Sequence, residues 1–401
     1  MKNVKIAGII AEYNPLHRGH ALQIARTRAL LGEDCAVIAV MSGHFVQRGS
    51  PALADKWRRA EIALLGGVDL VLELPTVWAA APAEVFAQGG AALLQDAGVV
   101  THLSFGSECG DVSALTAVAD CLDAPVYRER LREFLGQGLP FAVCRQRAAE
   151  ALLGRERAAL LNSPNNNLGV EYLRALRRLK SPICPITVRR EGAGHDAPGL
   201  PGGDTASASQ LRRWLGEGNW DAAAPCLLPG EEVLLAQTPL FLDAGRLERM
   251  TLARLRIMTA EDWAELPDSG QAEGLPDRLA RAGRACRSLE EFYQLAKSKR
   301  YSHARLRRLA LWAFLGLRAL DRPARSPYLR VLAANGRGRE VLRLMKESAA
   351  LPIVTRPARA EGEEARRLLA LESRCTDLYG LCLPGEIPAG GREWRQPPAM
   401  A

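Results

Sequence analysis

The 401-residue sequence predicts an α/β protein, in which a doubly wound parallel sheet is followed by a second, mostly helical domain. In the N-terminal half, strand-length apolar runs alternate with helix-length periodic segments, which is typical of buried parallel strands joined by crossover helices. From about residue 220 the strand signals fade, and Leu, Ala and Arg dominate. We therefore expect one domain over residues 1–220 and another over residues 221–401.

The predicted strands are five apolar runs, at residues 4–11, 35–42, 68–74, 99–105 and 183–188. Parallel strands with right-handed crossovers place a ligand crevice at their carboxyl ends. His17 and Gly106 each follow one of these strands, so both are expected at that edge. The tail from about residue 384 has Gly and Pro but few large apolar side chains, and we expect it to be poorly ordered.

Between the first strand and a helix-like run at residues 21–31, the sequence reads Asn-Pro-Leu-His-Arg-Gly-His. Gly19 lacks a Cβ where backbone must approach a ligand, and the unpaired amides that begin a helix attract anions. His17 and His20 flank this glycine and can donate hydrogen bonds to phosphate oxygens. The motif supplies no nucleophile, which favours positioning and charge stabilisation in an attack at phosphorus. The alternative is two histidines that only cap or pack a helix start.

A histidine pair of this form after a first strand resembles the signature of the HxGH nucleotidyltransferase superfamily. That superfamily's second signature, a Ser/Thr-rich turn that opens a late helix and ends in a basic residue, is matched by Thr205-Ala206-Ser207-Ala208-Ser209-Gln210-Leu211-Arg212. Further blocks, from the N-terminus to about residue 350, resemble one family, the bacterial tRNA(Met) cytidine acetate ligases. These blocks are Glu12-Tyr13-Asn14-Pro15, Met41-Ser42-Gly43-His44-Phe45, Gln47-Arg48-Gly49, Phe105-Gly106-Ser107-Glu108, Ser163-Pro164-Asn165-Asn166 and Lys297-Ser298-Lys299-Arg300-Tyr301.

The resemblance implies a two-step ligase. Acetate would be activated by ATP, with Mg²⁺, as an acetyl-adenylate; the acetyl group would then pass to the N4 amine of the wobble cytidine in elongator tRNA(Met). His17 and His20 would be catalytic. The implied ATP-binding residues are Ile9, Ile10, Ala11, Glu12, Tyr13, Asn14, Pro15, Leu16, His17, Arg18, Gly19, His20, Gly106, Asn165, Asn166, Arg190, Ser207 and Arg212.

Several of these assignments have plainer alternatives. Gly106 can be an ordinary turn glycine, and Ser207 can be a simple helix cap. Pro-Asn-Asn is a common turn sequence, so the sequence leaves open whether Asn165 or Asn166 faces the nucleotide. No protein metal ligands are assigned.

Positive charge is concentrated in one part of the chain. Residues 278–346 contain 18 Lys and Arg against 4 Asp and Glu, a balance of +14, whereas the whole chain carries +8 and the remainder therefore −6. Cations next to flat rings can follow a phosphate backbone and stack on an unpaired base. The predicted tRNA-binding residues are Lys297, Lys299, Arg300, Tyr301, Arg305 and Arg308. The alternative is an Arg-rich helical face exposed to solvent.

Composition limits the remaining possibilities. Nine cysteines without a Cys-x-x-Cys pair suit reduced thiols in a cytoplasm and do not favour structural zinc. The start does not resemble a signal peptide, no run approaches the ~20 apolar residues of a membrane span, and we expect a cytoplasmic protein. Two other functions stay open: an adenylyltransferase that acts on a phosphorylated small molecule, and an RNA-binding protein with a relic nucleotide fold. The sequence does not predict the oligomeric state.

Overall fold

The computed structural model describes residues 5–190, 206–270 and 274–401. All five predicted strands are present and parallel, in the spatial order β5-β2-β1-β6-β7. Their bounds are Ile6–Ala11 (β1), Ala36–Ser42 (β2), Leu70–Leu74 (β5), His102–Ser107 (β6) and Cys184–Arg189 (β7). From β1 the chain first builds the sheet outward through β2 and β5, and then returns to the other side with β6 and β7. The doubly wound fold is confirmed, with its switch point between β1 and β6.

Helices cover both faces of this sheet. Ile6 and Ile10 of β1 belong to a core shared with α4 (Ala83–Asp96) and α9 (Pro164–Arg178). The intervening Ala7 and Ile9 pack in a second core with α1 (Arg18–Leu31) and α2 (Lys56–Leu65). Successive side chains of a strand point to opposite faces, so a sheet covered on both sides needs apolar residues throughout. This explains the continuous apolar runs in the sequence.

The sheet extends beyond the predicted strands. Strand β8 (Leu329–Ala334) lies antiparallel to β5, and both β9 (Ile353–Val354) and β10 (Ala399–Met400) pair with β8 in parallel. A division of the chain at residue 221 is therefore wrong as a structural boundary, because the C-terminal part completes the N-terminal sheet. The sequence concealed β8 because Arg330 interrupts its apolar run; the guanidinium is buried and faces the carboxylate of Glu393 at 3.6 Å.

The expectation of a poorly ordered tail is also wrong. Helix α20 (Arg392–Arg395) brings Glu393 into the core, where its carboxylate lies 2.6 Å from the ammonium of Lys56. The same ammonium contacts Glu73 of β5 at 2.6 Å, and all three side chains are buried. Removing one partner from such a cluster leaves an uncompensated buried charge, which costs several kcal/mol, about 3–5. The cluster therefore fixes the tail to the sheet.

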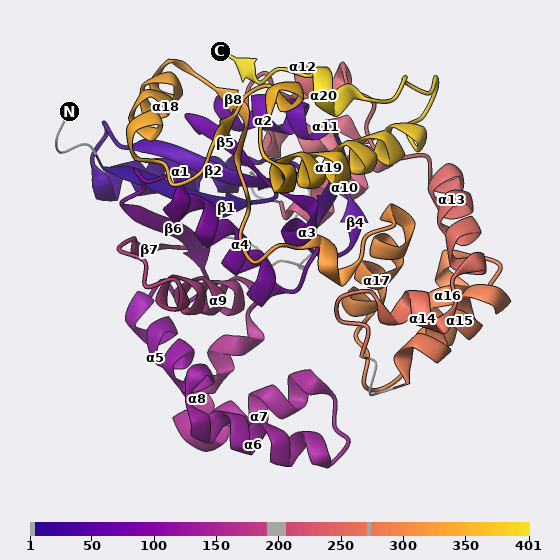
Figure 1. Cartoon of the computed structure of the whole chain (residues 1–401). Coiled ribbons are helices and arrows are strands. Elements are labelled where there is room, and N and C mark those ends of the chain that lie inside the picture. The colour runs from indigo at the N-terminus through magenta and orange to yellow at the C-terminus, as the bar shows by residue number, and fades with distance from the viewer. Residues whose placement is uncertain (1–4, 191–205, 271–273) are drawn as a thin grey trace.

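The remaining elements form two projecting groups and several connections. Figure 1 shows the first group at the bottom of the view, beneath α9, and the second at the lower right, which is the helical part predicted from the sequence. The first group is α5 (Val112–Asp123), α6 (Pro125–Gly136), α7 (Phe141–Leu153) and α8 (Arg155–Ala158). The second is α13 (Ala244–Ile257), α14 (Ala260–Ala264), α15 (Leu275–Ala285), α16 (Leu289–Ala296) and α17 (His303–Leu315).

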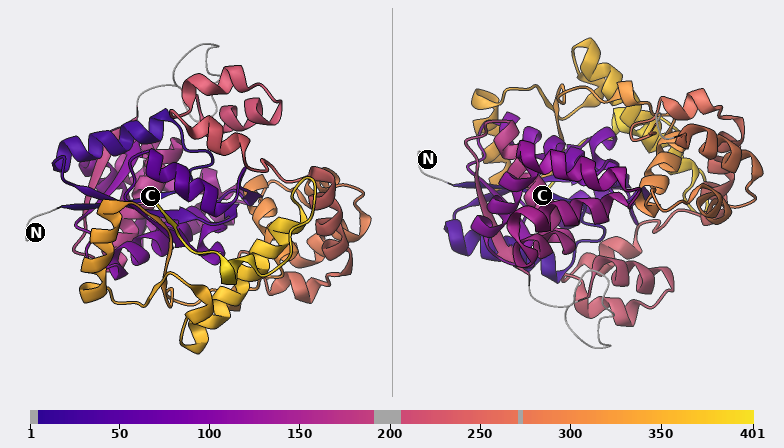
Figure 2. Two further views of the ribbon diagram at one scale, coloured as in Figure 1. Left: turned by 90° about the horizontal axis from the view of Figure 1, so that it is seen from above. Right: turned by 90° about the horizontal axis from the view of Figure 1, so that it is seen from below.

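Two further sets of helices lie on opposite sides of the sheet (Figure 2). On the side of α1 are α10 (Ala208–Gly216), α11 (Trp220–Ala223) and α12 (Glu231–Ala236), and on the other side are α18 (Gly336–Ser348) and α19 (Glu363–Leu381). The short helix α3 (Thr76–Ala79) follows β5, and a small hairpin joins β3 (Phe45–Val46) to β4 (Ser50–Pro51). All nine cysteines are free. None of the described helices combines the length and the apolar character that a membrane crossing requires.

Candidate active site

A cavity of about 330 Å³ opens at the switch point of the sheet, beside the carboxyl ends of β1 and β6. Most of the predicted nucleotide residues line it, although they come from five separate segments of the chain. These residues are Ile9, Ile10, Ala11, Glu12, Tyr13, Asn14, His17, His20, Gly106, Asn165, Arg190, Ser207 and Arg212. The fold thus brings both sequence motifs to one cavity.

His17 forms the N-cap of α1. Its Nδ1 accepts a hydrogen bond from the backbone N–H of Gly19 at 3.1 Å, and the residue is only 6% exposed. Because Nδ1 is an acceptor, the neutral ring carries its proton on Nε2. The cap therefore fixes both the position and the tautomer of an imidazole in the cavity wall.

His20 lies one helical turn further on, against the first ring. The two ring centroids are 3.9 Å apart, with an angle of 33° between the ring planes. Burial, together with the charges of His17 and Arg190, holds the pKa of His20 well below its usual value, so the ring is neutral at pH 7. Its buried Nδ1 has no hydrogen-bond partner among the described residues. An unmatched buried nitrogen costs about 1–3 kcal/mol, which a ligand atom in the cavity would recover.

Gly19 has a different role from the one the sequence suggested. A Cβ at this position would stand 2.9 Å from Cε1 of His17, which is too close for ordinary contact. The glycine therefore makes room for the imidazole, rather than directly for a ligand. Gly106 does lie in the cavity wall, where a Cβ would meet Cγ of Arg190 at 3.3 Å.

The cavity is electropositive. Arg190 directly follows β7, and its backbone N–H donates to the carbonyl of Ser107 at 2.8 Å. Arg212 of α10 donates to the carbonyl of Asn14 at 2.5 Å. The described lining contains three arginines, Arg48, Arg190 and Arg212, and one carboxylate, that of Glu12. Burial, with a smaller contribution from Arg48, lowers the pKa of Arg212. Two positive charges in excess suit a polyphosphate.

The second motif has the predicted placement. Ser207 caps α10, and its Oγ accepts a hydrogen bond from the N–H of Gln210 at 3.2 Å while the residue also lines the cavity. The start of α10 thus faces the same space as the start of α1. Thr205, the first residue of the predicted motif, lies outside the described residues.

The structure separates the two asparagines. The side-chain carbonyl of Asn166 accepts hydrogen bonds from the N–H groups of Glu108 at 2.9 Å and Cys109 at 3.1 Å, and the residue is buried. Asn165 lines the cavity, as does Asn167, which the sequence did not single out. Asn166 therefore holds the loop after β6, and Asn165 is the one exposed to a ligand.

Other predicted residues do not line the cavity. Leu16 is buried in the core against Gly66, and the Nε of Arg18 donates to the carbonyl of Leu227 at 3.3 Å. Pro15 and Gly19 are not among the lining residues either. Further residues line the cavity without a role predicted from the sequence: Gln23, Gln47, Arg48, Ser50, Phe86, Asn167 and Tyr172. Only Gln47 and Arg48 had a visible signal, the Gln-Arg-Gly block.

The predicted basic surface is smaller than the charge count suggests. Lys299 and Arg300 are exposed at the turn before α17, and Lys297 donates to the carbonyl of Tyr301 at 2.5 Å. Tyr301 is only 5% exposed, and the guanidinium of Arg305 lies 5.2 Å from its ring centroid. The idea that this ring stacks on a base is therefore wrong for this conformation: it packs in the core.

The other two cations predicted to bind tRNA, Arg305 and Arg308, already make contacts within the protein. Arg305 donates to the carbonyl of Asp268 at 2.9 Å, and Arg308 lies 3.9 Å from the carboxylate of the same residue. Burial lowers the pKa of Arg308. The +14 segment is also divided in space, because its last part forms β8 and α18 while α15–α17 lie at the lower right of Figure 1.

Among the described residues, no group of three or more His, Cys, Asp or Glu side chains has an arrangement that would hold a metal ion. A metal in this cavity would therefore have to be held mainly by the oxygens of a bound nucleotide, and Glu12 is the one carboxylate among the described lining residues.

Comparisons with known proteins agree with this geometry. The sequence matches the family model of the HIGH nucleotidyl transferases over residues 4–391. It is 35% identical to tRNA(Met) cytidine acetate ligases of Clostridium perfringens, over 95% of this chain and 96% of that one, and of Syntrophomonas wolfei, over 97% of each.

Solved structures match equally closely. The apo crystal structure of Thermotoga maritima TmcAL superposes with a TM-score of 0.91 at 32% identity, and covers 99% of both chains. A second structure of that protein, bound with alpha-thio ATP, gives a TM-score of 0.89 at 32% identity over the same share of each chain. Fold, cavity and full-length similarity together show that the chain belongs to the tRNA(Met) cytidine acetate ligase family of HIGH nucleotidyl transferases.

Proposed function

We propose that this protein activates acetate with ATP and transfers the acetyl group to the wobble cytidine of elongator tRNA(Met), forming N4-acetylcytidine. The observation that carries this proposal is the pair His17 and His20, whose rings lie 3.9 Å apart at the start of α1, in a cavity with two excess positive charges. The family relatives are named for this reaction, and a family structure binds an ATP analogue.

In the first step, a carboxylate oxygen of acetate attacks the α-phosphorus of ATP. A new P–O bond forms, the bond to the β-phosphate oxygen breaks, and pyrophosphate leaves with the negative charge. His17 and His20 donate hydrogen bonds to phosphate oxygens as charge shifts toward pyrophosphate, and the neutral ring of His20 can do so at pH 7 without a proton transfer. Mg²⁺ would be bound mainly by the triphosphate oxygens, because the described residues offer no cluster of metal ligands.

We assign the rest of the nucleotide to the surrounding walls. The backbone of residues 9–14 and Gly106 would border the base and ribose, with Asn165 and Arg190 at the β6–β7 side. Ser207 and Arg212 would hold the β- and γ-phosphates, because the start of α10 offers backbone amides and a partial positive charge there.

In the second step, the N4 amine of cytidine attacks the carbonyl carbon of the acetyl-adenylate. The C–N bond forms, the C–O bond to AMP breaks, and the amine loses a proton. The intermediate hydrolyses readily in water, so its formation in a cavity serves the reaction. We place tRNA on the exposed side of α17 and the turn before it, with Lys299 and Arg300 as the most accessible cations. The reaction belongs in the cytoplasm, which also suits nine free thiols.

The two steps of the proposed reaction use different parts of the chain, without a domain boundary at residue 221. Residues 1–220 provide the cavity for ATP and acetate, and the helices after residue 221, chiefly α13–α17, receive the tRNA, although β8 and β10 complete the first sheet.

Exchange of labelled pyrophosphate into ATP tests the first step. We expect exchange that depends on acetate and does not need tRNA. Exchange that ignores acetate but requires a phosphorylated small molecule would instead show an adenylyltransferase. No exchange with any acceptor, from a protein that still binds tRNA, would leave only an RNA-binding protein.

A further inference from the structure

A second groove lies beside the nucleotide cavity. It has a volume of about 760 Å³ and runs between α9 and the group α5–α7. Its charged lining consists of five arginines and three carboxylates, a surplus of two positive charges: Arg128, Arg145, Arg174, Arg177, Arg178, Glu84, Asp123 and Glu171. None of these residues has a role in the adenylation step derived above.

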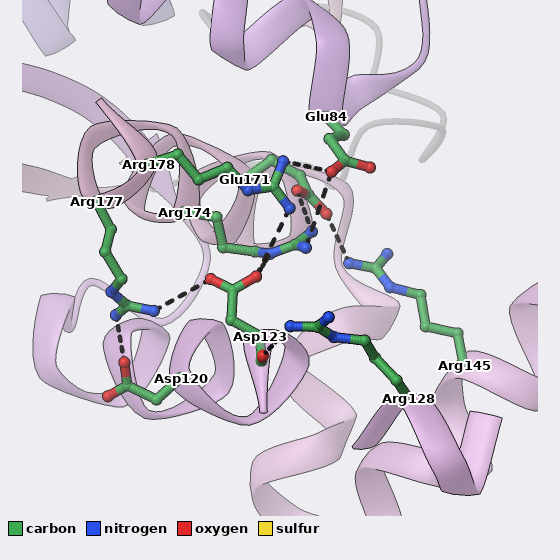
Figure 3. Close-up of polar contacts among 9 residues, drawn as sticks. All are labelled: Glu84, Asp120, Asp123, Arg128, Arg145, Glu171, Arg174, Arg177 and Arg178. Atoms are coloured by element: carbon green, nitrogen blue, oxygen red, sulfur yellow. Dashed lines mark hydrogen bonds and ion pairs between the residues drawn. The ribbon is translucent and has the colours of Figure 1, made fainter. Parts of the chain in front are cut away.

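Carboxylates hold the arginines of this groove in place (Figure 3). Arg174 lies at the centre, 2.7 Å from Glu171 and 2.8 Å from Asp123, and its side chain is only 13% exposed. Arg145 contacts Glu171 from α7 at 2.9 Å. The network therefore joins α5, α7 and α9 and sets the spacing of the outer guanidinium groups.

The outer arginines remain open to solvent. The side chain of Arg177 is 41% exposed although it pairs with Asp120 and Asp123, and that of Arg178 is 36% exposed although it pairs with Glu84 and Asp123. Arg128 is exposed, and its guanidinium donates to a backbone oxygen, that of Asp123, at 2.9 Å. A guanidinium bonded to a carbonyl keeps its full charge and spare donors for a phosphate.

This groove adjoins the nucleotide cavity. Ala83 lines both. Arg145 of the groove donates a hydrogen bond from Nη1 to the side-chain oxygen of Asn167, at 2.6 Å, and Asn167 lines the cavity. Residues of the β3–β4 hairpin also line the cavity, and its Gly49 lies against the backbone of α17, which projects from the sheet separately from α5–α7 (Figure 1). The cavity is thus bordered by arginine-bearing surfaces on both sides.

A nucleotide of an RNA loop that enters a cavity remains joined to the RNA chain on both its 5′ and its 3′ side. Each neighbour carries a phosphate, so cationic surfaces on both borders of the cavity could contact the chain on both sides of the bound base. The side of α17 provides one of them. Phe141 is 56% exposed at the rim of the groove, where a flat ring can stack on an unpaired base.

We propose that the arginine groove between α9 and α5–α7 binds the phosphates of the tRNA segment that leaves the cavity on the side opposite α17. The groove then acts with Lys299 and Arg300 to span the anticodon loop. This proposal rests on the proposed function for the identity of the RNA.

The test compares two double variants that remove equal charge from neighbouring sites. Arg128→Ala with Arg177→Ala removes two exposed arginines of the groove. Arg130→Ala with Arg132→Ala removes two exposed arginines of α6 that are not among the groove's lining residues. Binding of unmodified elongator tRNA(Met) would be measured at three salt concentrations, and acetate-dependent pyrophosphate exchange would report whether each variant folds.

We expect the groove variant to bind tRNA about 10-fold or more weakly than the wild type. The slope of log affinity against log salt concentration should become shallower by about one unit per lost phosphate contact. Acetate-dependent pyrophosphate exchange should stay at the wild-type rate. Equal affinity in the two variants would overturn the proposal and leave the network as a structural support for α5–α7. If the groove variant lost affinity but the wild-type protein acetylated no tRNA, the groove would stand and the proposed function would fall.

Discussion

Gly49 lies directly against the backbone of Arg308. A Cβ at Gly49 would stand 2.5 Å from the backbone nitrogen of Arg308, and the glycine has φ +76°. Its neighbours Gln47, Arg48 and Ser50 line the nucleotide cavity, whereas Arg308 belongs to α17. A single tight turn therefore connects the cavity to the basic helix, and its position requires glycine both for conformation and for space.

Gly49→Ala should disturb this junction. We expect a loss of more than about 1 kcal/mol in the free energy of unfolding, because alanine is strained at positive φ and its Cβ would press on α17. Urea unfolding measures the change. Gly136→Ala at the end of α6 is the control, since no atom lies within 4 Å of the new Cβ there. Equal stability of the two variants would contradict the contact.

His20→Ala should slow acetate-dependent pyrophosphate exchange by ~10²-fold or more, because it removes a donor that acts on the charge of the leaving group. Binding of tRNA should stay nearly unchanged. His102→Ala, at the start of β6 and outside the cavity lining, is the control. Similar losses of exchange in both variants would show that His20 has no special part in the reaction.

Gly19→Ala should act through His17. The added methyl group would meet the imidazole at 2.9 Å and displace it from its cap on α1. Because small displacements of reacting groups are costly, we expect exchange to fall by about 10- to 10²-fold. The melting temperature should change by only a few degrees. Exchange at the wild-type rate would mean that the ring can move without loss.

His44 should make stability depend on pH. Its ring is stacked on Tyr379 at 4.5 Å, and burial, with the charges of Lys56, Arg59 and Arg392, holds its pKa well below the usual 6.5. Below pH 6.5 the unfolded chain gains a proton at this site that the folded chain does not, so stability falls by up to about 1.4 kcal/mol per pH unit.

His44→Phe should remove this contribution. Urea midpoints of the wild type and the variant would be compared at pH 7.5 and 5.5, so that other titrating groups, including His20, cancel in the difference. A drop in the variant as large as that of the wild type would contradict the assignment.

Lys299→Ala with Arg300→Ala should weaken tRNA binding and reduce its salt dependence, because both side chains are exposed beside α17. Arg339→Ala with Arg343→Ala is a stringent control: both arginines belong to the same basic stretch of sequence, but they are exposed on α18, at a distance from α17 in Figure 1. Equal effects would mean that total charge, and not position, determines binding.

The sequence allowed the central sheet and the histidine motif to be predicted because both depend on local patterns. A strand buried on both faces shows itself as an unbroken apolar run, as in β2. His17 and His20 flank a glycine, and their separation of three positions is enough to bring both rings together at the first turn of α1.

Features that depend on distant partners were not visible. Arg330 makes β8 look like a surface segment, and only its partner Glu393, 63 positions later, explains the burial of the charge. Tyr301 seemed suitable for base stacking because its neighbours are basic, yet the fold buries the ring. Asn167 lines the cavity near the start of α9, but nothing in the sequence distinguishes it from the two asparagines that precede it.

The central claim is tested most directly by incubating the purified protein with labelled acetate, ATP and unmodified elongator tRNA(Met), and then digesting the RNA to nucleosides. The proposed function predicts that the label appears as N4-acetylcytidine at the wobble position, and that His20→Ala abolishes most of it. Unlabelled tRNA after complete turnover of ATP, or equal labelling by His20→Ala, would contradict the account.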